Sequence, residues 1–352
     1  MDKPKAYSLR KYITALIDTA YTLTLLFLFL GLGFSKALAD KAPLPVYLLA
    51  AFLLYYVLSF PLHFYQSYLL EHKFCLSTQK FLAWLADQFK TGVISYLITL
   101  AIAGVFYFTQ ARWPQYWWLA LSLFWIFFSL VLAKLFPVII LPLFFKYKKL
   151  SDETLRGRIM NLAQKMGVRI LDVFEIDFSK KTLKANAALI GMGSTRRVIL
   201  ADTLKDKYSA EEIEVVLAHE FSHYRLKHLI KLVLINCAVT VFSFYLLFKT
   251  AGFVLGIFGL ASLKELAALP LVAVYLTLLG IILQPAQNYL SRVMEKNADI
   301  MALKITGLKE PFISLMEKLA SQNLADKKPH PLIKFYFFDH PPIDERVALA
   351  KL

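Results

Sequence analysis

Residues 219–223 read HEFSH, and this spacing brings two metal-binding side chains to one face of a helix. His219 and His223 are four residues apart, so in an α-helix their imidazoles point the same way. Two neutral imidazoles at this spacing can bind one Zn²⁺, and Glu220 between them can act as a base toward a water that the metal activates. The pentapeptide therefore predicts metal-assisted hydrolysis of a peptide bond. The alternative is a pair of helix histidines whose ring nitrogens have other partners.

A catalytic zinc site usually has three protein ligands and keeps one position for water. His228 is a poor third ligand, because on a continuous helix it lies half a turn around from His219. Glu295 is a better candidate, since it shares one helix face with Asp299 in the segment SRVMEKNAD. We expect Glu295 to bind the metal and Asp299 to accept the free ring N–H of His219. The alternative here is a solvated, charged helix end.

The chain that must position these side chains is apolar enough to be embedded in a membrane. Of its 352 residues, 58% are hydrophobic, which is more than a soluble domain usually contains. Six apolar runs reach the length of about 20 residues that a spanning helix needs. These runs lie at 15–35, 45–68, 91–110, 114–135, 229–249 and 268–289.

Two further stretches are ambiguous. Residues 136–146 contain two prolines, so they either extend the fourth helix with a kink or dip into the membrane interface, and the count of membrane helices is six or seven. Residues 250–267 contain three glycines and are expected to form a loop or a short helical cap.

Residues 147–228, between the fourth and fifth runs, read as a small α+β domain. Ser209 and Glu212 fit a capping box, so HEFSH falls well inside a helix that starts at Ser209. A helix is also expected at 152–166 and a strand at 170–177. A hairpin is expected from strands at 183–190 and 196–201.

The sequence thus predicts a mainly α-helical, polytopic membrane protein with four parts. The last two apolar runs form a membrane hairpin, which returns Glu295 to the side of HEFSH. The parts are N-terminal membrane helices at 1–146, a metallopeptidase domain with the HEFSH helix at 147–228, the membrane hairpin at 229–289, and the C-terminal part of the catalytic domain with the third ligand at 290–352.

Charge and cysteine content narrow the function classes. The net charge of +15 is explained by basic loops on the cytoplasmic side, so no nucleic-acid partner is expected. The loops on the opposite side hold only a few of the 40 Lys and Arg residues, which favours a cytoplasmic catalytic side. Cys75 and Cys237 form no CxxC pair, which excludes a cysteine-based zinc site.

Several segments together resemble one family. HEFSHYRLKH followed by a distant ExxxD on a returning helix resembles the integral-membrane gluzincin metallopeptidases, among them the type I CAAX prenyl proteases and the HtpX-type proteases. Residues 70–90 resemble a loop between two spanning helices of the type I CAAX prenyl proteases, and 136–150 resemble their segment entering the catalytic domain. DHPPIDERVALA at 339–350 resembles their H-P-x-x-x-E-R element. Eukaryotic CAAX proteases have seven spanning helices around a large chamber, one more than the six runs found in this sequence.

The resemblance implies a gluzincin domain, one Zn²⁺ per chain, and roles for further residues. Glu295 would be the third zinc ligand, and His340 and Arg346 would hold the substrate and stabilise the oxyanion. Asn186, in KANAALIG, would lie on an edge strand that binds substrate backbone. Without the resemblance, His340 would be interpreted as part of a proline-rich turn, Arg346 as a surface cation, and Asn186 as a polar residue at a strand end.

The resemblance indicates an integral-membrane zinc metalloendopeptidase similar to CAAX prenyl protease 1. Its expected partners are the lipid bilayer and peptide or protein substrates, membrane-associated or lipidated. The first alternative is an HtpX-type quality-control protease, and the second is a non-catalytic membrane zinc protein or a transporter. The expected location is the cytoplasmic membrane in a bacterium and the endoplasmic reticulum in a eukaryote.

Overall fold

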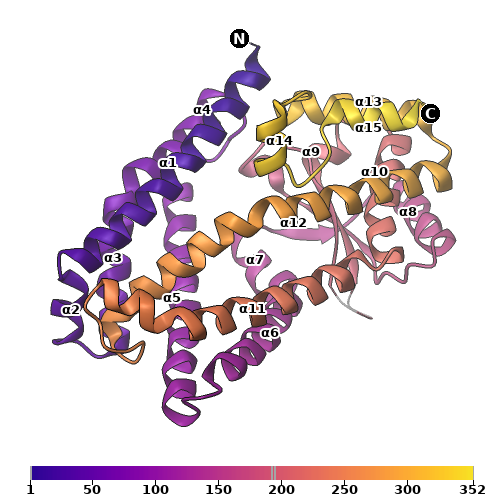
Figure 1. The fold of residues 1–352 in the computed structure, drawn as a ribbon. Coiled ribbons are helices and arrows are strands. Elements are labelled where there is room, and N and C mark those ends of the chain that lie inside the picture. The colour runs from indigo at the N-terminus through magenta and orange to yellow at the C-terminus, as the bar shows by residue number, and fades with distance from the viewer. Residues whose placement is uncertain (1, 192, 194–195, 352) are drawn as a thin grey trace.

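The computed structural model describes residues 2–191, 193 and 196–351, which form long helices and one small sheet (Figure 1). Six helical segments among these residues are long and apolar enough to cross a bilayer, which confirms the six predicted spans. They run over Lys3–Gly31, Leu44–Lys73, Phe81–Arg112, Trp117–Phe144, His228–Ile257 and Leu266–Thr306. The first, third and fifth are the single helices α1, α5 and α11. The second comprises α3 (Leu44–Phe64), η1 (Tyr65–Leu69) and α4 (Leu70–Lys73), and the sixth comprises η5 (Leu266–Ala268) and α12 (Leu269–Thr306).

The proline-containing stretch 136–146 extends the fourth membrane helix. α6 (Trp117–Leu135) continues through a π-helical turn, η2 (Phe136–Ile140), into α7 (Leu141–Phe144). Because a proline removes one backbone donor and crowds the preceding turn, a wider turn is the expected accommodation. The stretch is therefore part of one interrupted helix and not a separate seventh span.

The prediction of a loop or short cap over 250–267 is wrong for its first half. α11 continues to Ile257 and includes Gly252 and Gly256, and a connection with the short 3₁₀ helix η5 follows. In a bilayer, backbone polar groups must bond within the helix, which outweighs the weak helix propensity of glycine.

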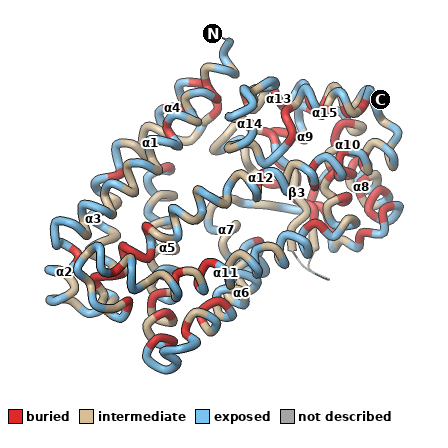
Figure 2. Tube along the Cα trace, viewed as in Figure 1, coloured by how far each residue is buried: buried red, intermediate tan, exposed pale blue. Residues whose placement is uncertain are grey.

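Buried residues gather around α8 and α10, whereas the membrane helices show mostly exposed and half-buried positions (Figure 2). Large apolar side chains on the membrane helices remain uncovered by protein, for example Val57, Phe253 and Ile282. Such a surface suits a lipid environment. Between these helices lies a cavity of about 1030 Å³, lined almost wholly by apolar side chains of α1, α3, α5, α6, α11, α12 and the short α2 (Phe34–Ala39).

The sheet has four strands in the order β1-β2-β4-β3. β2 pairs in parallel with β4, and both edge strands pair antiparallel to their neighbours. The predicted hairpin is present as β3 and β4, although its turn includes residues outside the described part of the chain. The strands are β1 (Tyr147–Lys149), β2 (Val173–Ile176), β3 (Ala187–Ile190) and β4 (Arg197–Ala201). The remaining helices are α8 (Glu153–Lys165), η3 (Phe178–Lys180), α9 (Asp202–Lys205), α10 (Ala210–Arg225), α13 (Lys309–Gln322), α14 (Pro331–Phe337) and α15 (Ile343–Ala350).

α10 carries HEFSH and is fixed at its start and along its apolar face. Ser209 caps it, and Glu212 completes the predicted capping box. The buried Glu212 carboxylate also accepts hydrogen bonds from Ser314 and Lys318 of α13 at 2.7 and 2.8 Å. The side chains that anchor the helix in the core are Ile213, Leu217 and Phe221. A cap and a buried face together hold the two histidines at a defined angle.

α10 ends just after the motif. Lys227 adopts a left-handed conformation with φ 56° and ψ 34°, and α11 starts at His228. A left-handed residue that is not glycine is strained by about 1–2 kcal/mol. This residue therefore separates α10 from the fifth membrane helix, α11.

Candidate metal centre

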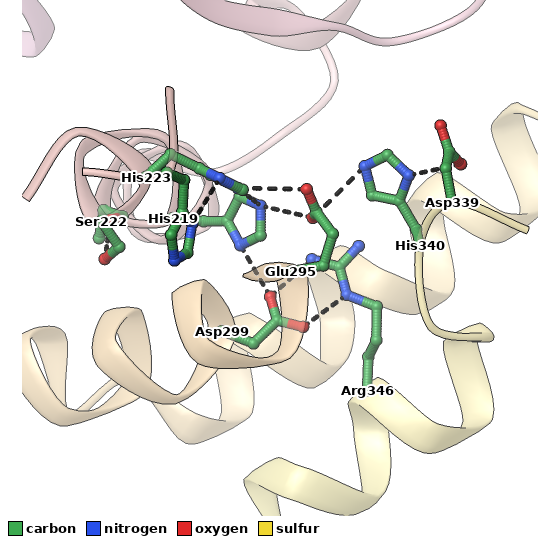
Figure 3. Close-up of polar contacts among 10 residues, drawn as sticks. His219, Ser222, His223, Glu295, Asp299, Asp339, His340 and Arg346 are labelled. Atoms are coloured by element: carbon green, nitrogen blue, oxygen red, sulfur yellow. Dashed lines mark hydrogen bonds and ion pairs between the residues drawn. The ribbon is translucent and has the colours of Figure 1, made fainter. Parts of the chain in front are cut away.

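His219 and His223 of α10 face Glu295 of α12 (Figure 3). Nε2 of His219 lies 3.1 Å from Oε2 of Glu295, and Nε2 of His223 lies 3.3 Å from Oε1 of the same carboxylate. One ligand atom from each residue lies within 4.8 Å of the others. Helical periodicity thus brings the two histidines together, and the return of α12 from the membrane supplies the third predicted ligand.

The three side chains fit a divalent cation. Glu295 is 7% exposed, and its Oε2 is buried without a hydrogen-bond partner among the described residues. Although Nε2 of His219 approaches this oxygen, the two atoms do not have hydrogen-bond geometry, which is consistent with ligand atoms directed at a common point. An unpaired buried carboxylate oxygen is costly, and a cation bound between the three groups would compensate it. Two imidazoles and one carboxylate are also a donor set of catalytic zinc sites.

Asp299 orients the first histidine, as predicted. Nδ1 of His219 lies 2.8 Å from Oδ1 of the fully buried Asp299. An N–H at Nδ1 leaves the lone pair on Nε2, which is the nitrogen that faces Glu295. Burial disfavours a charged His219, but the hydrogen bond to Asp299 and the nearby negative charge of Glu295 outweigh it and raise the pKa of His219 to about 9 in the metal-free site.

Arg346 reaches the site through Asp299. Its Nε and Nη2 donate to the two carboxylate oxygens at 2.7 and 2.6 Å, and the side chain is buried. These contacts favour a positioning role, in which the guanidinium neutralises and holds the carboxylate that orients His219. The guanidinium lies between Asp299 and Glu295 in Figure 3, and its predicted contact with an oxyanion stays a prediction.

His340 approaches Glu295 from the side opposite the two histidines (Figure 3). Its Nε2 lies 3.3 Å from Oε2 of Glu295, and its Nδ1 lies 2.8 Å from Oδ1 of Asp339. Although burial opposes the charge, Asp339 and Glu295 raise the pKa of His340 above its ordinary value. Since the side chain is 51% exposed, it can meet a ligand that enters from solvent. Asp339 was missed at the sequence level, although it directly precedes His340 in the DHPP segment.

Glu220 and Asn186 occupy the positions expected from their elements. Glu220 is half-buried on α10, and burial raises the pKa of its carboxyl, with the negative Glu295 adding to the rise and the histidines opposing it. A raised pKa suits a group that must take up a proton. Asn186 is exposed directly before β3, which is an edge strand that contacts α10.

His228 lies closer to the site than the sequence predicted. Its Nδ1 is 3.0 Å from Nδ1 of His223. The angular estimate from His219 was wrong because it assumed one continuous helix, whereas the chain turns at Lys227. His228 is nevertheless not part of the group of three ligand atoms.

Two family models match almost the whole chain. A model described as peptidase family M48 matches residues 149–351, and one described as CAAX prenyl protease N-terminal, five membrane helices, matches residues 1–146. Among the described residues, that N-terminal range holds four candidate membrane spans.

The chain is also similar to curated proteins from bacteria and eukaryotes. It is 32% identical to the uncharacterized metalloprotease YhfN of Bacillus subtilis over 78% of this chain and 66% of that protein. It is 28% identical to CAAX prenyl protease 1 of Saccharomyces cerevisiae over 82% of this chain and 67% of that protein. The chain therefore spans about two thirds of the length of these relatives.

A solved structure has the same fold. The crystal structure of S. mikatae Ste24p superposes with a TM-score of 0.90 at 24% sequence identity, covering 100% of this chain and 90% of that one. At this identity the likeness supports the arrangement of helices and sheet described above.

The contact between Asp299 and His219 leads to a prediction about metal affinity. Asp299→Asn should weaken Zn²⁺ binding by about 10- to 100-fold, because a neutral amide orients and polarises the imidazole less well than a carboxylate. Titration of the metal-free protein against a competing chelator measures this. Asp172→Asn is the matched control, since Asp172 is another buried carboxylate held by an arginine, Arg156, at 2.7 Å in the same domain. An equal loss in both variants would contradict the assignment.

The raised pKa of His219 predicts a proton that competes with the metal. Below a pH of about 9 the metal-free imidazole is protonated, so the bound metal must displace that proton. Zinc affinity should therefore rise about tenfold for each pH unit from about 7 to 9, and binding at neutral pH should release about one proton from this group. Calorimetry in buffers of different ionisation enthalpy counts the protons released. An affinity that does not change with pH would count against a protonated His219.

Proposed function

The chain belongs to peptidase family M48, and from this premise we propose that it is a zinc endopeptidase that cleaves membrane-associated or lipidated proteins. The family matches confirm the predicted family, the mainly helical membrane fold and the class of enzyme, a membrane metalloprotease. They also favour the CAAX prenyl protease type over the HtpX type. The observation that carries the proposal is the convergence of His219, His223 and Glu295 around one buried, unpaired carboxylate oxygen.

We assign the metal site and the base as follows. His219, His223 and Glu295 would hold one Zn²⁺ per chain. The bound ion supplies Lewis acidity, which lowers the pKa of water to about 7 and polarises a carbonyl group. Glu220 accepts the proton of the attacking water and later delivers it to the leaving amine. Its raised pKa makes it a better proton acceptor than an ordinary carboxylate.

The remaining residues orient a metal ligand, stabilise the attacked carbonyl oxygen or bind the substrate backbone. Asp299 and Arg346 keep His219 in the tautomer that leaves Nε2 free. His340 lies beside the ligand carboxylate and can donate an N–H to the negative oxygen that develops on the attacked carbonyl. Substrate backbone would add to the exposed edge of β3 near Asn186, a mode of recognition that tolerates many sequences.

The apolar cavity between the membrane helices supports a substrate with an apolar part. Its walls are almost wholly hydrocarbon, and none of the predicted site residues lines it. The excess of Lys and Arg on the side of the catalytic domain supports a cytoplasmic active site, at the cytoplasmic membrane of a bacterium or the endoplasmic reticulum of a eukaryote.

The role of Glu220 can be separated from metal binding. Glu220→Gln should retain one Zn²⁺ per chain but lower kcat by about 10²- to 10⁴-fold, because an amide cannot take up the proton. His219→Ala should lose both the metal and the activity. Mass spectrometry of bound metal and cleavage of a reporter peptide measure the two effects. Retained hydrolysis in Glu220→Gln would rule out the base assignment.

The two protease types are distinguished by substrate. We expect the zinc-loaded protein to cleave a farnesylated C-terminal peptide faster than the same peptide without the lipid, since the lipid adds apolar contact. Glu220→Gln serves as the blank for both peptides. No gain from the lipid, together with rapid cleavage of a misfolded membrane protein, would favour the HtpX type instead.

A further inference from the structure

The side chain of His228 has a defined place that the proposed chemistry leaves unused. It is 1% exposed at the first position of α11, and its Nδ1 lies 3.0 Å from Nδ1 of His223. The rings are inclined by 75° with their centroids 5.0 Å apart, so they meet edge to face. A hydrogen bond between two ring nitrogens requires a proton on one and a lone pair on the other.

The direction of this hydrogen bond follows from the metal site. Nε2 of His223 faces Glu295, and this nitrogen must keep its lone pair free in order to bind a metal. A neutral imidazole carries one proton, so in His223 that proton is on Nδ1. Nδ1 of His228 must then be the acceptor, which makes His228 neutral, with its own proton on Nε2.

We propose that His228 is a positioning residue, whose neutral ring nitrogen accepts the Nδ1–H of His223 and fixes the tautomer and orientation of that metal ligand. This inference rests on the proposed metal site. His219 has an equivalent outer partner in Asp299, so each imidazole ligand is held at its second nitrogen. The need is greater for His223, because its side chain is 26% exposed, compared with 10% for His219.

The backbone at Lys227 supports this assignment independently. A lysine in the left-handed region is strained, and such strain persists where the surrounding structure requires it. If α10 continued through residue 228, the imidazole would project away from the ligands. The strained turn instead places His228 beside His223 and buries it there.

Two substitutions separate hydrogen bonding from packing. His228→Leu has a similar volume without an acceptor, and we expect it to weaken zinc binding by about 10- to 100-fold. His228→Asn places a carbonyl oxygen near the position of Nδ1, and we expect its affinity to stay within about threefold of the unsubstituted protein, since the acceptor is restored. Ser222→Ala is the matched control: Ser222 is also buried next to His223, but its hydroxyl donates to the carbonyl of Ala218 and contacts no ligand.

The measurements are the dissociation constant for Zn²⁺, by competition with a chelator, and the visible absorption of the Co²⁺-substituted protein. Thermal unfolding of each metal-free variant establishes that it is folded, and His228→Met replaces His228→Leu in the comparison if the leucine variant is not. Wild-type affinity in the variant without an acceptor would overturn the inference. So would an equal loss in His228→Asn, because packing would then explain both results. A wild-type chain that binds no zinc would overturn the proposed function as well, so the two failures are distinguishable.

Discussion

Two carboxylates that are buried between α10 and α12 impose the main physical constraint on this structure. Asp299 is fully buried and Glu295 is 7% exposed, and the removal of an uncompensated carboxylate from water costs several kcal/mol. Asp299 is compensated within the protein by the bidentate contact of Arg346. Glu295 faces imidazole nitrogens, and its Oε2 has no donor within the described residues. A divalent ion bound between the two helices would compensate the charge of this second carboxylate.

The same two helices connect the metal site to the bilayer. α12 has 38 residues and is about 57 Å long, which exceeds the roughly 30 Å of a hydrocarbon core. One helix thus begins in the membrane and carries Glu295 and Asp299 at its other end. α11 begins at His228, beside His223, and continues into the membrane. Both helices of the membrane hairpin therefore touch the site, so its height above the bilayer is set by helix length and not by a flexible linker.

Local periodicity explains what could be predicted from the sequence. His219 and His223 within HEFSH, like Glu295 and Asp299 within ExxxD, are about one helical turn apart, so the relative directions within each pair follow from the helix alone. The hydrophobic runs indicate that the chain returns. The partner of Arg346 could not be predicted, because it depends on how α15 packs against α12, and no local pattern encodes that contact. The length of α11 was underestimated because glycine propensities measured in water do not apply in a bilayer. His228 was misplaced because nothing in the sequence marks Lys227 as a left-handed residue.

The balance of charge explains why a neutral group suits position 228. The ionised carboxylates of Glu220, Glu295 and Asp299 together equal the charge of one guanidinium and one divalent ion. A site with those members has no net charge, so its burial costs less free energy than that of a charged site. A carboxylate at position 228, in contact with His223, would add a negative charge with no cation assigned to it. A neutral imidazole supplies the hydrogen-bond acceptor that His223 needs and leaves this balance unchanged, whereas Asp299 can be charged because Arg346 accompanies it.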